Sequence, residues 1–230
     1  MSIVSKRRKT REISIGNVKI GSGAPISVQS MTNTKTQDVD ATVSQIRGLE
    51  KAGCEIIRVA VPDMEAALAI EKIKAGITIP LIADIHFDYR LALAAARAGA
   101  DGLRINPGNI GSKKKIKAVV DCAHEYKIPI RIGVNAGSLE KEIEQRLGVT
   151  AQAMVESALH NIWLLEDLGF RNIKVSLKAS DVSRTVSAYR LLSSLTDIPF
   201  HIGVTEAGGL FAGISKSAIG IGILLSEGIG

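Results

Sequence analysis

Short runs rich in β-branched residues alternate with longer Ala- and Leu-rich segments along nearly the whole chain of 230 residues. This alternation constrains the fold more than any other feature, because strands that alternate with helices predict parallel βαβ units. We expect strands at Pro25–Thr32, Glu55–Val61, Pro80–Phe87, Gly102–Asn106, Pro129–Asn135, Asn172–Lys178 and Pro199–Thr205. We expect helices at Val39–Lys51, Met64–Lys74, Tyr89–Ala98, Lys113–Tyr126, Ala151–Leu168, Ser183–Leu195 and Ser215–Ser226.

Seven strand–helix units predict an α/β fold, either an eight-stranded barrel or a doubly wound sheet, and we favour a TIM-type (β/α)8 barrel. The seventh strand starts at Pro199 and the sequence stops at Gly230, about one strand-to-strand period later. An eighth strand is therefore expected just beyond the last residue. We predict a barrel domain over residues 12–230 that is truncated before strand 8, which leaves two open sheet edges.

Two features precede the first strand. Glu12–Ile20 alternates apolar and polar residues around a Gly16-Asn17 turn, which predicts a β-hairpin that closes the bottom of the barrel. Residues 1–11 are predicted to be a basic tail, and we expect the charges of Lys6–Lys9 to be solvated because no apolar signal-peptide segment follows them.

Composition excludes several classes of protein. Hydrophobic residues make up 46% of the chain, which is enough for a sizeable core and argues against disorder. Only 3% of residues are aromatic, too few for the stacking platforms of single-strand nucleic-acid binders. No apolar run reaches the length of a membrane helix. Cys54 and Cys122 lie far apart without a CxxC spacing, which indicates buried thiols in a reducing, cytoplasmic compartment.

The predicted strands place cations on the inward face of the barrel. Side chains of a strand alternate between the helix layer and the interior, and the interior of such barrels is normally filled with branched aliphatic residues. Here the inward positions of four strands carry Arg58, Arg104, Arg131, Lys174 and Lys178. The same faces carry Asp84, His86, Asn106, Asn135, Ser176, His201 and Thr205.

Such a cluster predicts an anionic ligand. The net charge of +6 already points to an acidic partner, and unpaired cations are costly to bury. Arginine suits bidentate contacts with phosphate oxygens, so a diphosphate fits both the charge and the donors. The alternative is an internal salt-bridge network, to which Asp84 and Glu206 could contribute. Two inward histidines beside Asp84 could also hold a metal, but the neighbouring cations would repel it, so we predict no metal site.

Two strand ends carry further candidates. The segment Asn106–Gly111 is rich in turn-forming residues, and its backbone N–H groups could bind phosphate. Glu206 follows the last predicted strand at the end where barrel enzymes place catalytic groups. Strict alternation turns Glu206 outward, so its approach to the site depends on the loop.

Six ordered segments carry a resemblance to a known family over roughly Arg11–Gly230. They are Val28–Thr32, Ile82–His86, Leu103–Gly111, Arg131–Leu139, Lys174–Ser180 and Gly203–Gly208. These segments resemble the barrel of 4-hydroxy-3-methylbut-2-enyl diphosphate synthase, an oxidoreductase of isoprenoid precursor biosynthesis. The resemblance implies that 2-C-methyl-D-erythritol 2,4-cyclodiphosphate is reductively opened with loss of water. It implies a [4Fe-4S] cluster in a separate C-terminal domain, flavodoxin or ferredoxin as electron donor, and a homodimer when the protein is complete.

The resemblance also assigns roles to residues. The five inward cations would hold the diphosphate, Glu206 would act as an acid/base group near the leaving hydroxyl, and four residues would assist: His86, Asn106, Asn135 and Ser176. The sequence departs from the family because the cysteines that hold the cluster are lacking, and neither Cys54 nor Cys122 replaces them. We therefore expect this chain to bind substrate at best, without turnover.

Two other functions stay open from the sequence. A pterin-binding barrel of the dihydropteroate synthase type shares the architecture and also handles a diphosphate. A nucleic-acid binder would use the net positive charge, but the inward position of the cations argues against it. We expect neither a nucleic-acid nor a membrane partner.

Overall fold

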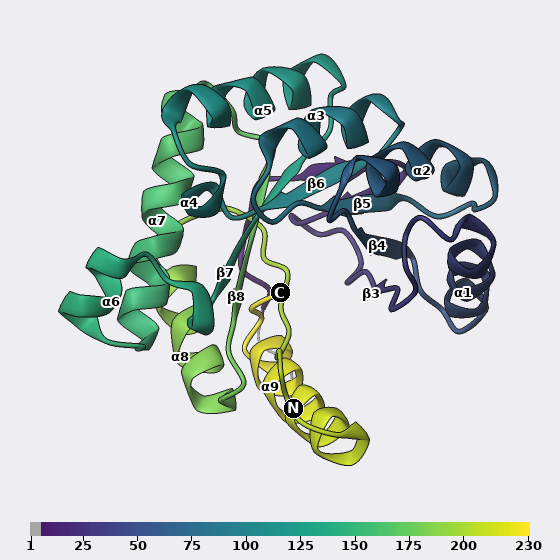
Figure 1. The fold of residues 1–230 in the computed structure, drawn as a ribbon. Coiled ribbons are helices and arrows are strands. Elements are labelled where there is room, and N and C mark those ends of the chain that lie inside the picture. Colours follow the sequence, from purple (N-terminus) through teal and green to yellow (C-terminus); the bar gives the residue numbers. More distant parts are fainter. Residues whose placement is uncertain (1–5) are drawn as a thin grey trace.

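The computed structural model describes residues 6–230 of the chain. Within them, six parallel strands form one sheet in the order of the sequence and curl into a partial barrel (Figure 1). The strands are β3 (Gln29–Met31), β4 (Ile56–Ala60), β5 (Leu81–Asp84), β6 (Gly102–Ile105), β7 (Ile130–Asn135) and β8 (Ile173–Lys178). The TIM-type α/β architecture is therefore confirmed.

Helices cover the outer face of the sheet, and α9 lies beside α8 (Figure 1). The helices are α1 (Val39–Lys51), α2 (Met64–Ala75), α3 (Tyr89–Arg97), α4 (Pro107–Ile110), α5 (Lys113–Glu125), α6 (Lys141–Leu147), α7 (Ala151–Asp167), α8 (Val182–Ser193) and α9 (Leu210–Ser226). Aspartate side chains accept the first backbone N–H groups of several helices, and each such cap contributes about 1 kcal/mol. The capping residues are Asp38, Asp63, Asp88 and Asp181.

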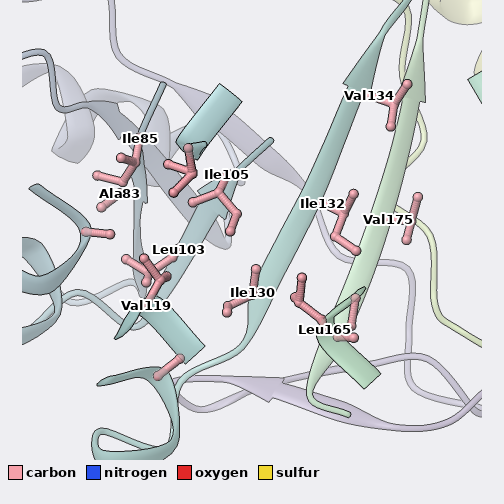
Figure 2. Packing of buried hydrophobic residues seen from close by; sticks show 14 of the residues in the cluster. Ala83, Ile85, Leu103, Ile105, Val119, Ile130, Ile132, Val134, Leu165 and Val175 are labelled. Carbon is pink, nitrogen blue, oxygen red and sulfur yellow. The ribbon is translucent and has the colours of Figure 1, made fainter. Parts of the chain in front are cut away.

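The main core lies between the strands and the outer helices. Aliphatic side chains from successive strands pack with Val119 of α5 and Leu165 of α7 in one buried cluster (Figure 2). Each fully buried Val, Leu or Ile side chain stabilises the fold by roughly 1.5–3 kcal/mol relative to an exposed one. The labelled strand residues are those predicted to face the helices: Ala83, Ile85, Leu103, Ile105, Ile130, Ile132, Val134 and Val175.

A hairpin of β1 (Ile13–Ile15) and β2 (Val18–Ile20) precedes the sheet, as predicted. Its apolar side chains form a second, smaller cluster with Ile56 and Ile82, the inward residues at the start of β4 and β5. The hairpin therefore closes the end of the barrel at which the strands begin.

The two outermost predicted strands are wrong in extent. Pro199–Thr205 forms only one isolated bridge, between Val175 and Phe200, and otherwise bonds to the β8 segment at widely spaced points. In the predicted strand Pro25–Thr32, only β3 pairs regularly with a neighbour. Both segments have a strand on one side only among the described residues. Most of each segment is therefore extended chain without a continuous ladder of backbone hydrogen bonds.

The basic segment before the hairpin is not simply solvated. Arg7 and Arg8 are half-buried, and their guanidinium groups donate to the backbone carbonyls of Ala24 and Ile198 respectively. Arg8 also lies 4.0 Å from the centre of the Phe200 ring. The two guanidinium groups therefore contact backbone carbonyl oxygens and an aromatic ring, whereas the sequence predicted that water would solvate them. Met1–Ser5, the rest of the predicted tail, lie outside the described residues.

Three features of the helices were not predicted. The short helix α4 lies within the turn-rich segment after β6, and α6 lies in the connection after β7. Helix α9 begins at Leu210 rather than at Ser215, with Gly209 as its N-cap. Helices α6 and α9 begin without a side-chain cap, so no capping pattern in the sequence marks their start. Helix α4 is capped by the side chain of Asn106.

Candidate anion-binding site

Neighbouring strands bring four charged residues into one row. Asp84 of β5 is the register partner of Arg104 on β6, Arg104 is the partner of Arg131 on β7, and Arg131 is the partner of Lys174 on β8. Because paired residues of adjacent parallel strands project to the same face, all four side chains point into the barrel. We call Arg104, Arg131 and Lys174 the cationic row.

Asp84 is the only acid in direct contact with the arginines of this site among the described residues. Its carboxylate lies 3.1 Å from Arg104 Nη1 and 3.5 Å from Arg58 Nη1. Burial by itself would raise the pKa of Asp84, but the contact with His86 and the neighbouring guanidinium charges lower that pKa well below its usual range. Asp84 therefore stays ionised and holds two arginines in place.

Arg131 has no such partner. Only 2% of the residue is exposed, and its Nε and Nη1 atoms are buried without a hydrogen-bond partner among the described residues. Burial and the charges of Arg58 and Arg104 lower the pKa of Arg131 well below its usual range. Buried donors without partners are rare in folded proteins, and a missing ligand is one explanation for them.

The absence of a side chain at Gly133 makes room for the site. A Cβ atom on Gly133 would lie 2.3 Å from Arg104 Nε, which is far inside van der Waals contact. The same guanidinium donates to the Gly133 carbonyl oxygen at 3.2 Å. The β7 backbone therefore both accepts the Arg104 side chain and fixes its direction.

Two lysines extend the site to the last strand. Lys174 is 3% exposed, and its Nζ atom lies 3.3 Å from Gln29 Oε1. Lys178, the last residue of β8, is half-buried, and its Nζ atom lies 3.0 Å from His201 Nε2. Burial and nearby cations lower the pKa of Lys174 well below its usual range and lower the pKa of Lys178 to about 7.

A buried tyrosine positions the segment that carries His201. Tyr189 Oη accepts from the Leu177 backbone N–H at 3.0 Å and donates to the His201 carbonyl oxygen at 2.6 Å. One phenol thus joins β8 to the extended segment that follows α8. This bridge keeps the His201 ring beside Lys178 although the segment has no regular ladder.

A cavity of about 430 Å³ lies between Pro25–Gln29 and Pro199–Val204. Lys174 and Lys178 line it from β8, while Ile26, Val28 and Ile202 contribute apolar walls. It lies between the two edges of the sheet that have a strand on one side only among the described residues. The arginines Arg58, Arg104 and Arg131 are not among the residues that line it, so the cavity reaches the site from the lysine side.

The remaining predicted site residues differ in position. Asn106 and Ser176 are buried, Asn135 and Thr205 are half-buried, and His86 is exposed at the rim, with 57% of its side chain in solvent. Asn106 accepts from the Gly108 backbone N–H at 3.2 Å and so shapes the turn after β6. Asn135 and Ser176 share the register of β7 and β8 with Lys178 and Gly133 respectively.

Glu206 lies apart from these groups. It is exposed, and its backbone φ of 49° is in the left-handed region, which residues other than glycine rarely adopt. Within residues 6–230 its carboxylate forms no ion pair. The structure therefore places Glu206 on the surface, outside the group of charged side chains.

Three further inward residues contact the charged groups: Gln29, Met31 and His201. Met31 Sδ lies 2.9 Å from Arg58 Nη2, and the other two contact the lysines. The predicted alternation had already placed all three on inward faces. Nothing in the sequence separates neutral side chains that orient charged ones, such as Gln29 and Met31, from other residues on the inward faces.

The two cysteines do not form a cluster site. Cys54 lies just before β4 and Cys122 lies within α5, and both are buried free thiols. Within residues 6–230, no group of three or more His, Cys, Asp or Glu side chains is arranged to hold a metal ion. In the same part of the chain, the helices are too short or too polar to cross a membrane.

A family model described as the GcpE TIM-barrel domain matches residues 10–230. The chain belongs to this family. A similar curated relative is 4-hydroxy-3-methylbut-2-en-1-yl diphosphate synthase (flavodoxin) of Marinomonas sp., with 59% identity over 226 residues. The alignment covers 98% of this chain and 61% of that relative, so the chain spans about three fifths of its length. The resemblance drawn from the six segments is therefore confirmed.

Solved structures similar to this GcpE barrel share its fold at low sequence identity. Type I 3-dehydroquinate dehydratase of Clostridium difficile aligns with a TM-score of 0.67 and 14% identity, covering 96% of this chain and 88% of the other. Dihydropteroate synthase of Xanthomonas albilineans aligns with a TM-score of 0.55 and 13% identity, covering 94% and 98%. These similarities support the barrel architecture alone, and they do not favour a pterin-binding function.

Proposed function

We propose that this chain is the substrate-binding barrel of a 4-hydroxy-3-methylbut-2-en-1-yl diphosphate synthase, and that its interior binds 2-C-methyl-D-erythritol 2,4-cyclodiphosphate. The observation that carries the proposal is Arg131, a buried guanidinium with two unpartnered donors inside a group of cations. A diphosphate supplies both the negative charge and the acceptor oxygens that these donors lack. The family relationship supports the same ligand.

Each charged group has a role in this proposal. Five cations would neutralise the diphosphate and fix its position: Arg58, Arg104, Arg131, Lys174 and Lys178. Asp84 would orient Arg58 and Arg104, with which it forms ion pairs. Neutral and rim residues would hydrogen-bond to the ligand: His86, Asn106, Asn135, Ser176 and Thr205.

Glu206 would supply the acid/base group near the leaving hydroxyl. In the structure it is exposed, so this role requires the Thr205–Gly209 loop to bring the carboxylate inward once the ligand is bound. The negative charge of the diphosphate would repel the Glu206 carboxylate. The positive charges of the nearby arginines and lysines would offset this repulsion.

The complete protein would contain more than this barrel. We propose that residues 12–230 form one barrel domain and that a separate domain holds a [4Fe-4S] cluster, which flavodoxin reduces, as the name of the Marinomonas relative indicates for that protein. We also propose a homodimer and a cytoplasmic location. The described residues offer no thiolate set for the cluster, so this chain alone should bind the ligand without converting it.

Calorimetric titration of the folded chain tests the ligand assignment. The cyclic diphosphate should bind saturably, inorganic diphosphate should compete for the same site, and a pterin should give no heat. The variant Arg47→Ala, which changes an exposed arginine on outer helix α1, should bind as the parent does. A folded chain that binds the pterin and ignores the cyclic diphosphate would overturn the proposal.

Binding should weaken as the pH rises above about 7. The pKa of Lys178 in the free chain is about 7, lowered by burial and nearby cations, so above that pH the bound anion must draw a proton back onto the amine. One proton taken up per ligand lowers the affinity by up to about tenfold per pH unit. The cyclic diphosphate keeps its charge in this range, because both phosphates are esterified and bridged.

Calorimetry at pH 6, 7, 8 and 9 in buffers of different ionisation enthalpy measures both the affinity and the proton uptake. The variant Lys178→Arg keeps its charge, so its affinity should decline less steeply between pH 7 and 9. A parent chain whose affinity stays level across this range would contradict the assignment of Lys178 to the anion site.

A further inference from the structure

Glu140 is an acid outside the cationic row, between the end of β7 and the start of α6. It is half-buried, and its side chain does not cap α6. Its Oε1 atom accepts from Asn161 Nδ2 of α7 at 2.9 Å, while Oε2 is buried without a hydrogen-bond partner among the described residues. Burying a carboxylate whose partner is an amide rather than a cation is unfavourable, which indicates a role other than stability.

Asn161 fixes this carboxylate to the outer helix layer. Asn161 is fully buried, and its Nδ2 atom also donates to the Ser157 carbonyl oxygen, one helical turn earlier, at 2.8 Å. Both protons of the amide are therefore used, so the side chain cannot rotate without breaking two hydrogen bonds. Glu140 Oε1 thus has a defined position relative to α7.

The same carboxylate contacts the turn that follows β6. A Cβ atom on Gly108 would lie 3.1 Å from Glu140 Oε1 and 3.4 Å from Glu140 Cγ. The bare backbone of Gly108, the second residue of α4, therefore packs directly against the Glu140 side chain. Glu140 lies between α7 and α4, and it fixes the position of the turn relative to the helix layer.

Gly108 in turn sets the direction of the Asn106 side chain. Asn106 follows Arg104 by two residues, so strand alternation directs both side chains into the barrel. Asn106 Oδ1 accepts from the Gly108 backbone N–H at 3.2 Å, which turns the Nδ2 atom away from α4. Nδ2 donates to no acceptor among the described residues. A free N–H donor beside a buried guanidinium suits an anionic oxygen.

We propose that Glu140 is a positioning residue of the anion site, which holds the Asn106–Ile110 turn so that Asn106 Nδ2 donates to a phosphate oxygen. This proposal rests on the proposed function, in which Asn106 hydrogen-bonds to the diphosphate, and it adds a residue that acts without contacting the ligand. The effect passes from Glu140 through the backbone of Gly108 to Asn106.

Calorimetric titration with inorganic diphosphate measures the effect. Glu140→Ala should weaken the binding about three- to tenfold, the equivalent of one hydrogen bond. Glu140→Gln keeps the volume of the side chain and the acceptor for Asn161 Nδ2, so it should bind as tightly as the parent chain. The matched control is Glu144→Ala, which removes an exposed carboxylate from α6 and should also bind as the parent does. Circular dichroism confirms that each variant is folded.

A double-mutant cycle shows whether Glu140 acts through Asn106. Asn106→Ala alone removes the donor and should weaken the binding by a similar factor. In a chain that carries Asn106→Ala, adding Glu140→Ala should cause no further loss, because no donor remains to be directed. A purely structural role of Glu140 would give the same loss in both backgrounds, and that result would overturn the proposal. So would a Glu140→Ala chain that binds diphosphate as tightly as the parent.

Gly108→Ala gives a second test that leaves the carboxylate in place. The added Cβ would lie 3.1 Å from Glu140 Oε1, so the turn must move away and the binding should weaken as it does in Glu140→Ala. Unchanged affinity in Gly108→Ala would contradict the proposed route, even if Glu140→Ala failed to fold.

Inorganic diphosphate also separates this proposal from the proposed function. A parent chain that binds inorganic diphosphate but not the cyclic diphosphate would reject the proposed ligand, while the cycle between Glu140 and Asn106 would still decide the positioning role. A parent chain that binds both, with additive losses in the cycle, would reject the positioning role and leave the proposed function in place. A folded parent chain that binds neither anion would overturn both.

Discussion

Replacing Arg131 with methionine should stabilise the free chain and at the same time weaken its binding of the cyclic diphosphate by about 100-fold. The two effects have one cause. In the free chain the guanidinium is 2% exposed, and two of its nitrogen atoms lack partners among the described residues. Exchanging such a buried charge for an apolar side chain of similar length is neutral or stabilising by about 1–4 kcal/mol. The ligand, however, loses a charge-assisted contact.

Urea unfolding measures the stability, and calorimetry measures the affinity. The matched control is Arg171→Met, which changes an exposed arginine just before β8 and should leave both quantities within error of the parent. A folded Arg131→Met chain that loses stability and keeps the parent affinity would show that Arg131 is satisfied within the fold. The internal salt-bridge network would then explain the cationic interior without a ligand.

The side-chain alternation of the central strands could be predicted because one face packs against the helices and the other holds charged residues inside the barrel. Ile57, Val59 and Ala83 pack in the helix-facing cluster, while Arg58 and Asp84 contact each other inside the barrel. A shift of one residue would bury these charges among aliphatic side chains, so the register is strongly specified. The same argument fails at the outer strands.

Ile26 and Val28 show why the outer strands were harder to predict. The sequence pattern assigns them to the helix-facing side, yet they are 45% and 54% exposed and line the open cavity. Their alternation is that of a buried strand, but no described strand lies beyond β3. The exposure of both side chains follows from this open sheet edge, which the sequence analysis predicted.

The site shows a second limit of sequence reasoning. Alternation placed the cations inside, but the sequence could not tell which of them Asp84 would pair with. In the structure Asp84 forms ion pairs with Arg104 and Arg58. Arg131, on the strand beyond Arg104, has no carboxylate partner among the described residues. The choice depends on side-chain reach across strands, including the space at Gly133, which no local pattern encodes.

Replacing Asp84 with asparagine should destabilise the free chain by about 3–5 kcal/mol, because it leaves buried guanidinium groups without their counter-charge. The substitution keeps the shape of the side chain and removes only the negative charge that Arg104 and Arg58 contact. Urea unfolding at pH 7 measures the loss. The control is Asp121→Asn, which breaks an exposed ion pair with Lys117 and should cost about 0.5 kcal/mol or less.

The pH dependence identifies the charge as the cause. The pKa of Asp84 is lowered in the folded chain, so its contribution is complete above the usual carboxyl pKa and is lost as the pH falls through the lowered value. The gap between the parent and Asp84→Asn should therefore narrow as the pH drops below about 4. A gap that stays constant down to acid pH would indicate lost packing rather than lost charge.

Inorganic diphosphate should restore part of the stability that Asp84→Asn loses. An anion that binds only the folded chain stabilises it by mass action, and here it also supplies the negative charge that the arginines have lost. The unfolding midpoint of the variant should then rise more with added diphosphate than that of the parent, while the same concentration of chloride has no such effect. An equal rise in both chains would mean that the anion binds away from Arg58 and Arg104, and the proposed site would have to be placed elsewhere in the barrel.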